Sequence, residues 1–241
     1  MRNVIVTGAS RGLGLGIATT LAASGYQVIA VARKPSAALE QAARGAAPGA
    51  IQFRASDLAN TAEIPAFVST LRKEFGGFYG LVNNAGLGTS GVLAMMRDEQ
   101  LADLVRLNTV SPMLLTKYVV RSMMSARTGR VINMASVVAA TGYHGLSVYS
   151  ATKASLIGFT RSLAREVGPL GITVNAIAPG FVATEMTQEL EGEPLEKITR
   201  RSALRRLAEV EDVAAAVEFL LSDRAKNITG TTVTVDAGNT A

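Results

Sequence analysis

Seven short runs rich in valine, isoleucine and threonine recur along the 241-residue chain, mostly separated by longer stretches of helical periodicity. The runs cover 3–7, 27–32, 51–55, 80–84, 130–135, 172–178 and 231–236. The helical patterns are clearest at 15–24, 62–75 and 211–222. Near-continuous apolar strands that alternate with helices indicate a parallel sheet covered on both faces. Because the crossovers are right-handed, the sequence predicts a doubly wound, Rossmann-type α/β sandwich with a seven-stranded parallel sheet.

No linker rich in serine, glycine and proline divides the chain, and no repeat of about 20 to 50 residues stands out. The length suits one α/β domain, so we expect residues 1–241 to form a single catalytic domain. Two segments interrupt the pattern, 34–50 and 185–202. The second is rich in charge and follows the sixth strand, where an open α/β sheet places its ligand crevice. We interpret 185–202 as a mobile substrate lid, with a pair of surface helices as the alternative.

The composition excludes several kinds of protein. The chain has no cysteine, and therefore no disulfide, no thiolate nucleophile and no cysteine-based zinc site, which fits a cytoplasmic location. The first strand begins at Asn3 without an export signal before it, and no apolar stretch approaches the roughly 18 residues of a membrane span. The net charge of +5 is scattered, which indicates a solvated basic surface or attraction to a phosphorylated ligand or acidic partner. The sequence contains no basic motif rich in aromatic residues, so nucleic-acid binding is not predicted.

A glycine-rich turn follows the first strand. The segment "TGASRGLG" places Gly8, Gly12 and Gly14 between that strand and the next helix. The amides and the dipole at a helix N-terminus attract an anion, and glycine lets its oxygens approach the backbone. The spacing differs from the G-x-G-x-x-G fingerprint, but its position after the first strand predicts a site for a dinucleotide pyrophosphate.

The end of the second strand indicates which dinucleotide. An NAD site would place a carboxylate there for the ribose 2'-hydroxyl, whereas this chain reads "AVARKP". Arg33 and Lys34, with Arg11 from the glycine turn, would attract the 2'-phosphate of NADP. We therefore predict NADP(H); the alternative is that Arg33 and Lys34 only cap a solvated strand end. Asp57, after the third strand, is placed to accept a hydrogen bond from adenine, although acidic residues are equally common in turns.

Two further motifs follow in order, "NNAG" at 83–86 and "YSATK" at 149–153. With the glycine turn, they make the chain similar to the short-chain dehydrogenase/reductase family over essentially its whole length. The Y-x-x-x-K spacing alone is weak, and the ordered set carries the resemblance. The segments "GRVINMASVV" and "GITVNAIAPGFVATEM" resemble the 3-oxoacyl-[acyl-carrier-protein] reductases of that family.

The resemblance implies catalytic roles for Asn108, Ser136, Tyr149 and Lys153, and no metal. Lys153 is four residues from Tyr149 on one helix face, so its ammonium can stabilise the phenolate, lower the tyrosine pKa and bond the nicotinamide ribose. Ser136 would donate a hydrogen bond to the substrate carbonyl as negative charge develops. Asn108 would hold a water that links Lys153 to solvent. Each residue alone has an ordinary structural interpretation, but all four match one family pattern.

The resemblance also implies a set of cofactor contacts. At the pyrophosphate, the 2'-phosphate and adenine these are Gly8, Arg11, Gly12, Leu13, Arg33, Asp57 and Leu58. Around the nicotinamide they are Asn83, Ala85, Gly86, Tyr149, Lys153, Pro179, Gly180, Val182 and Thr184. The shared helices are expected at 105–124 and 150–167. The tail "ITGTTVTVDAG" resembles the family's last strand, which predicts a homotetramer.

The expected reaction is NADPH-dependent reduction of a 3-oxoacyl thioester to the 3-hydroxyacyl product, with tyrosine as proton donor. The alternatives are a dehydrogenase of another secondary alcohol or ketone and a non-catalytic NADP-binding protein. Carrier-protein reductases dock the acidic carrier with two arginines near the mouth of the site. Arg127 matches one, and Leu170 stands where the second is expected, which weakens the prediction of an acyl carrier protein as partner.

The remaining candidates surround the expected substrate entrance. Tyr143 is expected to line the mouth, and His144, the only histidine, is interpreted as a surface residue of the substrate loop rather than a proton shuttle. The methionines at 95, 96, 123 and 124 are interpreted as packing residues rather than as a binding surface.

Overall fold

The structure is a computed structural model that describes residues 1–182 and 193–241. Its sheet has seven parallel strands in the order β3-β2-β1-β4-β5-β6-β7, which confirms the predicted fold class. The strands are β1 (Asn3–Thr7), β2 (Gln27–Ala32), β3 (Ile51–Ala55), β4 (Gly80–Asn83), β5 (Gly129–Met134), β6 (Ile172–Pro179) and β7 (Thr232–Val235). The first three match the predicted bounds, and the others differ by one residue at one or both ends.

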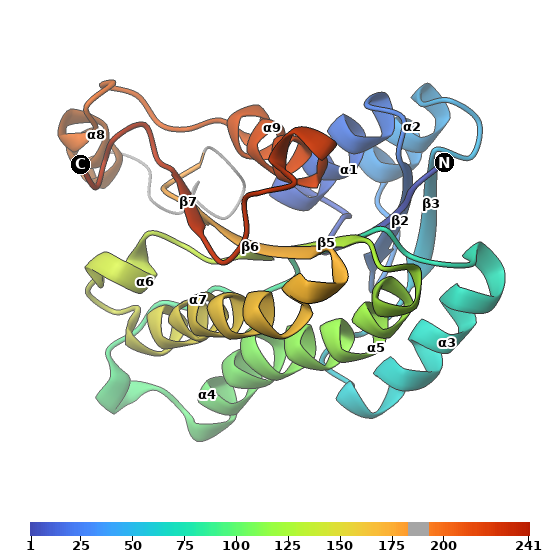
Figure 1. The fold of residues 1–241 in the computed structure, drawn as a ribbon. Coiled ribbons are helices and arrows are strands. Elements are labelled where there is room, and N and C mark those ends of the chain that lie inside the picture. Colours follow the sequence, from blue (N-terminus) through green and yellow to red (C-terminus); the bar gives the residue numbers. More distant parts are fainter. Residues whose placement is uncertain (183–192) are drawn as a thin grey trace.

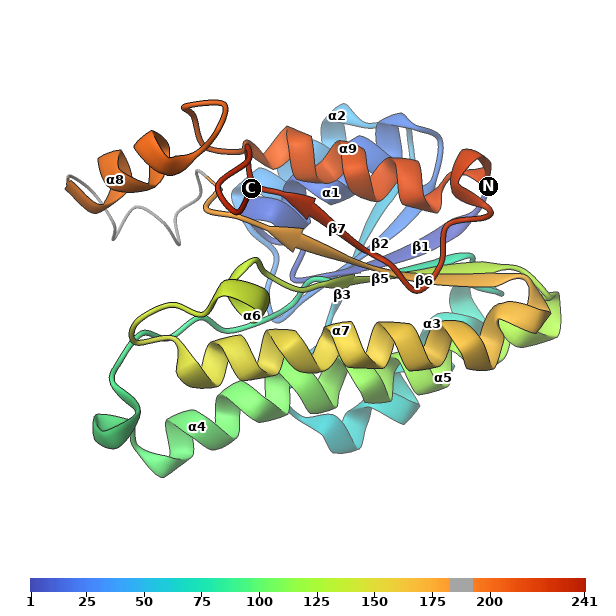
Figure 2. The ribbon, with the colours of Figure 1, turned by 60° about the vertical axis from the view of Figure 1, so that its left-hand side comes forward.

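Helices cover both faces of the sheet (Figure 1). One layer holds α1 (Gly12–Ala23), α2 (Ala37–Gly45) and α9 (Val210–Leu221). The other holds α3 (Ile64–Phe75), α4 (Asp98–Val105), α5 (Ser111–Ala126) and α7 (Ser147–Val167). Figure 2 shows the sheet between these layers, and each face has its own buried apolar cluster. Strands with apolar residues on both faces therefore fold as expected for a parallel sheet.

The chain reverses the direction of its sheet order at β1. From β1 it continues outward to β2 and β3, and then returns to place β4 on the other side of β1. The crevice of a doubly wound sheet lies at such a switch point, outside the carboxyl ends of the strands. The glycine turn after β1 and the segment after β4 therefore meet at this edge.

Two helix predictions need correction. The helix expected over 105–124 is broken: α4 ends at Val105, a π-helical turn occupies Arg106–Val110, and α5 begins at Ser111. The Ser111 hydroxyl donates to the carbonyl of Arg106, and proline occupies the first turn of α5, where its missing N–H costs no helical hydrogen bond. Helix α7, which carries the predicted pair Tyr149 and Lys153, begins at Ser147, before the expected start at residue 150.

The two segments that interrupt the pattern of strands and helices, 34–50 and 185–202, both contain helical residues. The stretch 34–50 includes α2, whose N-cap Ser36 accepts a hydrogen bond from the amide of Leu39. Of the predicted lid, residues 185–192 lie outside the described part of the chain, and residues 193–201 form α8 (Glu193–Arg201). A short helix, α6 (Val138–Thr141), precedes α7. None of the helices described here is long and apolar enough to cross a membrane.

Candidate active site

Three of the predicted catalytic residues meet where β5 ends and α7 begins. Lys153 donates a hydrogen bond from Nζ to the carbonyl of Met134, the last residue of β5, at 2.8 Å. Tyr149, in the first turn of α7, lies close enough to Ser136, which follows β5, for the serine side chain to act on the pKa of the phenol. The Lys153 ammonium lies 5.7 Å from the centroid of the Tyr149 ring. The i, i+4 spacing thus places both side chains on the helix face toward the sheet.

Burial controls the electrostatics of this pair. Lys153 is only 5% exposed, and burial lowers its pKa to about 8. Burial raises the pKa of Tyr149, while the hydrogen bond with Ser136 acts in the opposite direction. The direction is opposite to the expected lowering by Lys153, because loss of hydration is the largest cause and the lysine is not among the causes of the shift. At neutral pH, the phenol is therefore protonated and the lysine mostly charged.

Asn108 lies in the π-helical turn between α4 and α5, and its side chain is buried. Its Oδ1 accepts from the amide of Leu87 at 2.8 Å, and its Nδ2 donates to the Leu87 carbonyl at 2.8 Å and to Thr152 Oγ1 at 3.2 Å. The side chain therefore fastens the segment after β4 to α7, beside Lys153. π-Helical turns are frequent at functional sites, because they interrupt the regular hydrogen-bond ladder of a helix.

The "NNAG" segment brings the glycine turn and the catalytic residues together. A Cβ on Gly86 would lie 3.1 Å from Asn108 Oδ1 and 3.5 Å from Lys153 Nζ. A Cβ on Gly8 would lie 2.9 Å from the Cα of Ala85. The sequence analysis missed Thr7, whose hydroxyl accepts from the amides of Asn84 and Ala85 at 2.9 Å each. Gly8, Ala85 and Gly86 thus form one backbone surface at the switch point.

The glycine turn fits a dinucleotide. Gly8 and Gly12 adopt φ values of 66° and 54°, a region that favours glycine. Helix α1 begins at Gly12, and its N-cap residue makes no side-chain capping hydrogen bond. First-turn amides without a side-chain cap form a ready site for a pyrophosphate at the positive end of the helix dipole. The neighbouring Leu13 packs against the apolar cluster below.

The cations predicted for the 2'-phosphate lie on adjacent segments. Arg11 is in the glycine turn, and Arg33 and Lys34 follow β2; all three side chains are exposed. The loop after β2 is tied to the turn, because the Ser36 hydroxyl donates to the carbonyl of Ser10. The arrangement therefore fits an anionic group at this rim, in place of the carboxylate that an NAD site would offer.

Two other predicted contacts have internal partners. Asn83 is buried, and its Nδ2 donates to Thr116 Oγ1 at 2.9 Å and to Asn133 Oδ1 at 2.8 Å, so its side chain faces the protein interior. Asp57 is exposed and accepts from the amide of Ala59 at 3.0 Å, which is the turn geometry that we considered as the alternative. Its neighbour Leu58 is buried. The Nδ2 of Asn83 is thus occupied inside the protein, while its buried Oδ1 has no hydrogen-bond partner among the described residues.

The segment after β6 lies beside the loop that carries Ser136, between β5 and α6. The amide of Val137, next to Ser136, donates to the carbonyl of Pro179 at 3.1 Å. Gly180 packs against Asp236, and Val182 is buried and forms a parallel bridge with Ala208. These contacts continue β6 beyond its end and fit a wall for the nicotinamide. Thr184, the last predicted member of this wall, lies outside the described residues.

An aromatic pair stands near the loop that carries Ser136. Tyr143 packs against Phe181, with ring centroids 5.6 Å apart and an interplanar angle of 60°. We predicted Tyr143 but missed Phe181, although "PGFVAT" places it inside the expected nicotinamide wall, between Gly180 and Val182. His144 is exposed. Of the methionines, Met123 is buried, as expected for a packing residue, whereas Met95 is 83% and Met124 41% exposed, so the packing interpretation is wrong for these two.

Arg127 and Leu170 do not lie near the mouth of this chain's own site. Arg127 precedes β5 and donates from its guanidinium to the carbonyl of Pro169, beside Leu170. Ser136 and Tyr149 lie at the other end of β5 and α7, and the 21 residues of α7 span about 30 Å. Arg127 and Leu170 are therefore neighbours of each other, but they lie at the edge of the sheet opposite Ser136 and Tyr149. In a parallel sheet the amino ends of the strands lie at one edge and their carboxyl ends at the other.

Comparison with known proteins agrees with this geometry. A family model described as "Enoyl-(Acyl carrier protein) reductase" matches residues 8–240. The chain is 43% identical over 237 residues to "3-oxoacyl-[acyl-carrier-protein] reductase FabG" of Escherichia coli K12, covering 97% of this chain and 95% of that protein. Proteins of the same description from Pseudomonas aeruginosa and Staphylococcus aureus are 42% and 38% identical. They cover 97% and 98% of this chain, and 95% and 97% of their own length.

Proposed function

The chain belongs to the short-chain dehydrogenase/reductase family and is an oxidoreductase that uses a nicotinamide cofactor, and we propose that it reduces a 3-oxoacyl thioester with NADPH. The product is the 3-hydroxyacyl thioester. The observation that carries the proposal is the meeting of Tyr149, Ser136 and the buried Lys153, whose ammonium lies 5.7 Å from the centroid of the tyrosine ring. It is supported by relatives named as 3-oxoacyl-[acyl-carrier-protein] reductases over nearly the whole chain.

Reduction of a ketone requires a hydride at carbon and a proton at oxygen. Bound NADPH supplies the hydride. Ser136 donates a hydrogen bond to the carbonyl oxygen, which stabilises the negative charge that develops there. Tyr149 donates the proton, and its raised pKa keeps it protonated until that charge has formed. The phenolate that results is stabilised by the ammonium of Lys153, 5.7 Å from the ring centroid.

Asn108 has a positioning role in this proposal. Its bonds to Leu87 and Thr152 fix the segment that carries Gly86, which packs against Lys153. The backbone of its π-helical turn, rather than its occupied side chain, would hold the water through which Lys153 returns a proton to Tyr149. The role, holding a water beside Lys153, is the one predicted from the sequence, but backbone atoms rather than side-chain atoms would perform it.

The preference for NADPH rests on the cations at the rim of the nucleotide site. Arg11, Arg33 and Lys34 come from adjacent segments, and the turn after β2 offers no carboxylate beside them. Their attraction is specific to the 2'-phosphate, because a ribose hydroxyl carries no charge.

The Arg33→Asp substitution tests the choice of cofactor. Reversing this charge repels a 2'-phosphate and offers an acceptor to a ribose hydroxyl, so the NADPH-to-NADH ratio of kcat/KM should fall by on the order of tenfold or more. Arg44→Asp is a matched control, since Arg44 is an exposed arginine in the last turn of α2. An unchanged ratio in Arg33→Asp would remove Arg33 from the 2'-phosphate site.

The reaction is tested by NADPH oxidation in the presence of acetoacetyl-CoA and of the same acyl group on acyl carrier protein. The expected result is consumption of NADPH with formation of the 3-hydroxyacyl product. If both thioesters are inert, the proposal fails. Turnover of small cyclic or aryl ketones in that case would identify a dehydrogenase of another secondary alcohol, and cofactor binding without any turnover would identify a non-catalytic nucleotide-binding protein.

A further inference from the structure

A dense group of cations follows the nicotinamide wall. Within the ten residues 197–206, which read "KITRRSALRR", five side chains are basic and exposed: Lys197, Arg200, Arg201, Arg205 and Arg206. Arg200 has an ion pair with Glu196 at 3.7 Å, and both side chains are more than 70% exposed, so the pair contributes little. No acidic residue lies between Lys197 and Arg206 in the sequence, so the charges within this stretch are all positive. We call residues 197–206 the cationic turn.

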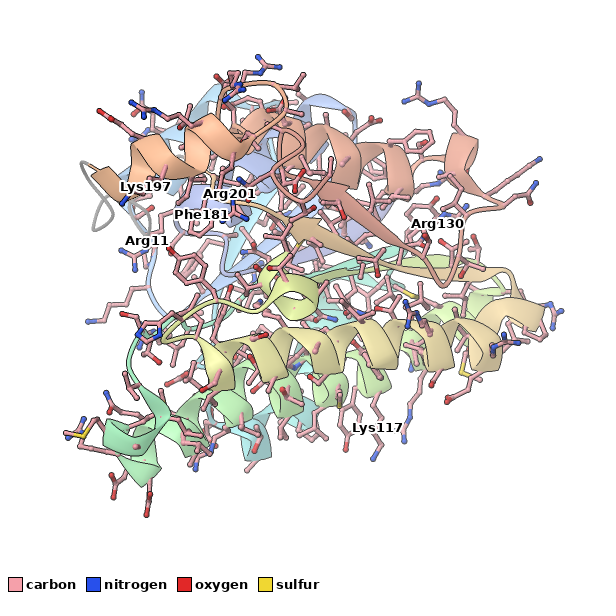
Figure 3. The ribbon with its side chains drawn as sticks, turned by 90° about the vertical axis from the view of Figure 1, so that its left-hand side faces the viewer. Arg11, Lys117, Arg130, Phe181, Lys197 and Arg201 are labelled. Carbon is pink, nitrogen blue, oxygen red and sulfur yellow. The ribbon has the colours of Figure 1, made fainter. Side chains whose placement is uncertain are left out.

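The cationic turn is anchored at the carboxyl edge of the sheet. The amides of Ala203 and Leu204 donate to the carbonyls of Gly238 and Ala237, which follow β7, at 3.2 and 3.0 Å. Directly after the turn, Ala208 bridges to Val182, beyond the end of β6. Figure 3 shows Lys197 and Arg201 at the same end of the molecule as Phe181 and Arg11, and Arg130 at the other end. The turn therefore borders the substrate entrance.

An exposed leucine occupies the middle of these charges. Leu204 is 61% exposed and lies between the pairs Arg200–Arg201 and Arg205–Arg206. Its position is fixed, because Arg205 adopts a left-handed φ of 54° and donates from its guanidinium to the carbonyl of Arg200. A left-handed conformation is unfavourable for arginine and persists only where surrounding bonds hold it. The backbone thus holds an exposed apolar side chain in a segment with arginines on both sides of it in the sequence.

We infer that the cationic turn is the docking surface for an acidic protein that carries the thioester substrate. The inference rests on the proposed function, and the similar proteins named for an acyl carrier protein make such a carrier its natural occupant. Positive charge steers and orients an acidic surface, and an exposed apolar residue between two pairs of arginines can give the contact a desolvated centre. A single phosphate would use one or two of these cations and leave Leu204 without a role.

The position of Arg127 strengthens this assignment. Arg127 lies at the opposite edge of the sheet from Ser136 and Tyr149, so within one chain it cannot hold a carrier at the entrance to that chain's site. The cationic turn lies at the correct edge. It also supplies more positive charge than the expected pair of arginines, of which only Arg127 is present because Leu170 stands in the place of the second.

The test compares one acyl group on two carriers. In the double variant Arg201→Glu with Arg206→Glu, kcat/KM for acetoacetyl-acyl carrier protein should fall about tenfold or more at low salt, and the loss should shrink as salt screens the charges. For acetoacetyl-CoA it should change less than about twofold, since no acidic protein docks. The control is Arg44→Glu with Arg72→Glu, which makes the same change in charge in the last turns of α2 and α3, at the opposite edge. It should leave both values unchanged.

Leu204→Ser tests the apolar centre without changing charge. It should lower kcat/KM for acetoacetyl-acyl carrier protein but not for acetoacetyl-CoA, and the loss should depend little on salt. An equal loss on both thioesters in the double variant would identify a phosphate site or a damaged fold and overturn the inference. No loss on the carrier substrate would also overturn it.

Direct binding separates this inference from the proposed reaction. If wild-type protein turns over neither thioester, the proposed reaction fails, and fluorescence anisotropy with labelled holo-acyl carrier protein still decides the docking. Salt-sensitive binding that the Arg201/Arg206 variant loses and the Arg44/Arg72 variant keeps supports the docking surface. Absence of such binding to the wild-type protein rejects it.

Discussion

Two buried cations lie at opposite ends of the sheet, and each is only 5% exposed. Lys153, at the carboxyl edge, bonds the Met134 carbonyl, and burial alone accounts for its lowered pKa of about 8. Arg130, at the entrance of β5, lies 3.7 Å from the carboxylate of Asp223 and 5.5 Å from the centroid of the Tyr79 ring. One cation is thus held without a counter-ion that shifts its pKa, and the other is part of an ion pair.

The difference separates reactivity from stability. An ammonium that pays for burial without a carboxylate is destabilised in its charged form, and any anion that forms beside it is correspondingly favoured. At the other end, Arg2 contacts the same two partners as Arg130. It lies 4.2 Å from the centroid of the Tyr79 ring and pairs with Asp223 at 3.0 Å. A guanidinium satisfied by rings and a carboxylate has nothing to offer a reacting group. We therefore expect substitutions at the Lys153 end to change turnover, and those at the Arg130 end to change stability.

The largest effect is expected for Tyr149→Phe. Without the phenol there is no proton donor, so kcat should fall by about 10²- to 10⁴-fold while NADPH binding, measured by fluorescence titration, is retained. Tyr79→Phe is the matched control at the other end of the sheet. It removes a hydroxyl that donates to the Leu221 carbonyl at 2.8 Å and should lower the melting temperature but not kcat. A Tyr149→Phe enzyme with nearly normal turnover would refute Tyr149 as donor.

Lys153→Met should have the next largest effect. Removing the ammonium leaves the phenolate without its stabilising charge, so kcat should fall about 10²- to 10³-fold. At the same time a buried charge is replaced by an apolar chain of similar length, so the melting temperature should stay the same or rise. A loss of stability together with the loss of turnover would mean that Lys153 is a structural cation like Arg130, and would break the distinction between the two ends.

The pH dependence should have opposite signs for turnover and for stability. Turnover that needs the ammonium should fall as pH rises through about 8, the pKa of Lys153. The pKa in the folded state lies below the ordinary lysine pKa of about 10.4, so the unfolded chain binds more protons between these two values. The contribution of this group to the free energy of unfolding therefore rises with pH there, by about 3 kcal/mol in total. Urea unfolding from pH 8 to 9.5 measures the slope, below the range where tyrosines ionise.

In Lys153→Met, the contribution of this residue to that slope should vanish. Arg130→Met should keep it, because a guanidinium stays charged over the whole range. If the wild-type protein showed no rise in stability that depends on Lys153, burial would not be the cause of its lowered pKa.

The sequence predicts the fold closely where local signals coincide with tertiary ones. The β1, β2 and β3 bounds follow from β-branched runs that end in glycine or polar residues, and Gly8 to Gly12 lie in the turn that their φ values require. The prediction of one continuous helix over 105–124 is wrong, because the break in that helix depends on hydrogen bonds that join Ser111 and Asn108 to distant segments. Such bonds leave no periodicity in the chain.

The site shows the same division. The identities of Ser136, Tyr149 and Lys153 follow from motif order, and the structure brings them together. The direction of the tyrosine pKa could not be predicted, because it depends on how much water the surrounding elements exclude. Phe181 was missed for a related reason: its contact with Tyr143 joins two segments about 40 positions apart, and neither segment alone requires it.

The smallest effect is expected for Arg130→Met, and it is the sharpest test of the comparison. Arg130 donates to the Gly129 carbonyl at 2.9 Å and pairs with Asp223, but its buried Nε has no hydrogen-bond partner among the described residues. The unmet donor offsets part of what the ion pair contributes, and Asp223 keeps Arg2 as a partner in the variant. The free energy of unfolding should therefore fall by only about 1–2 kcal/mol, with kcat/KM unchanged. A thermal unfolding scan measures the loss as about 2–8 °C. If stability instead rose, as we expect for Lys153→Met, the carboxylate and ring at this end would not compensate the buried charge, and the two cations would differ in position alone.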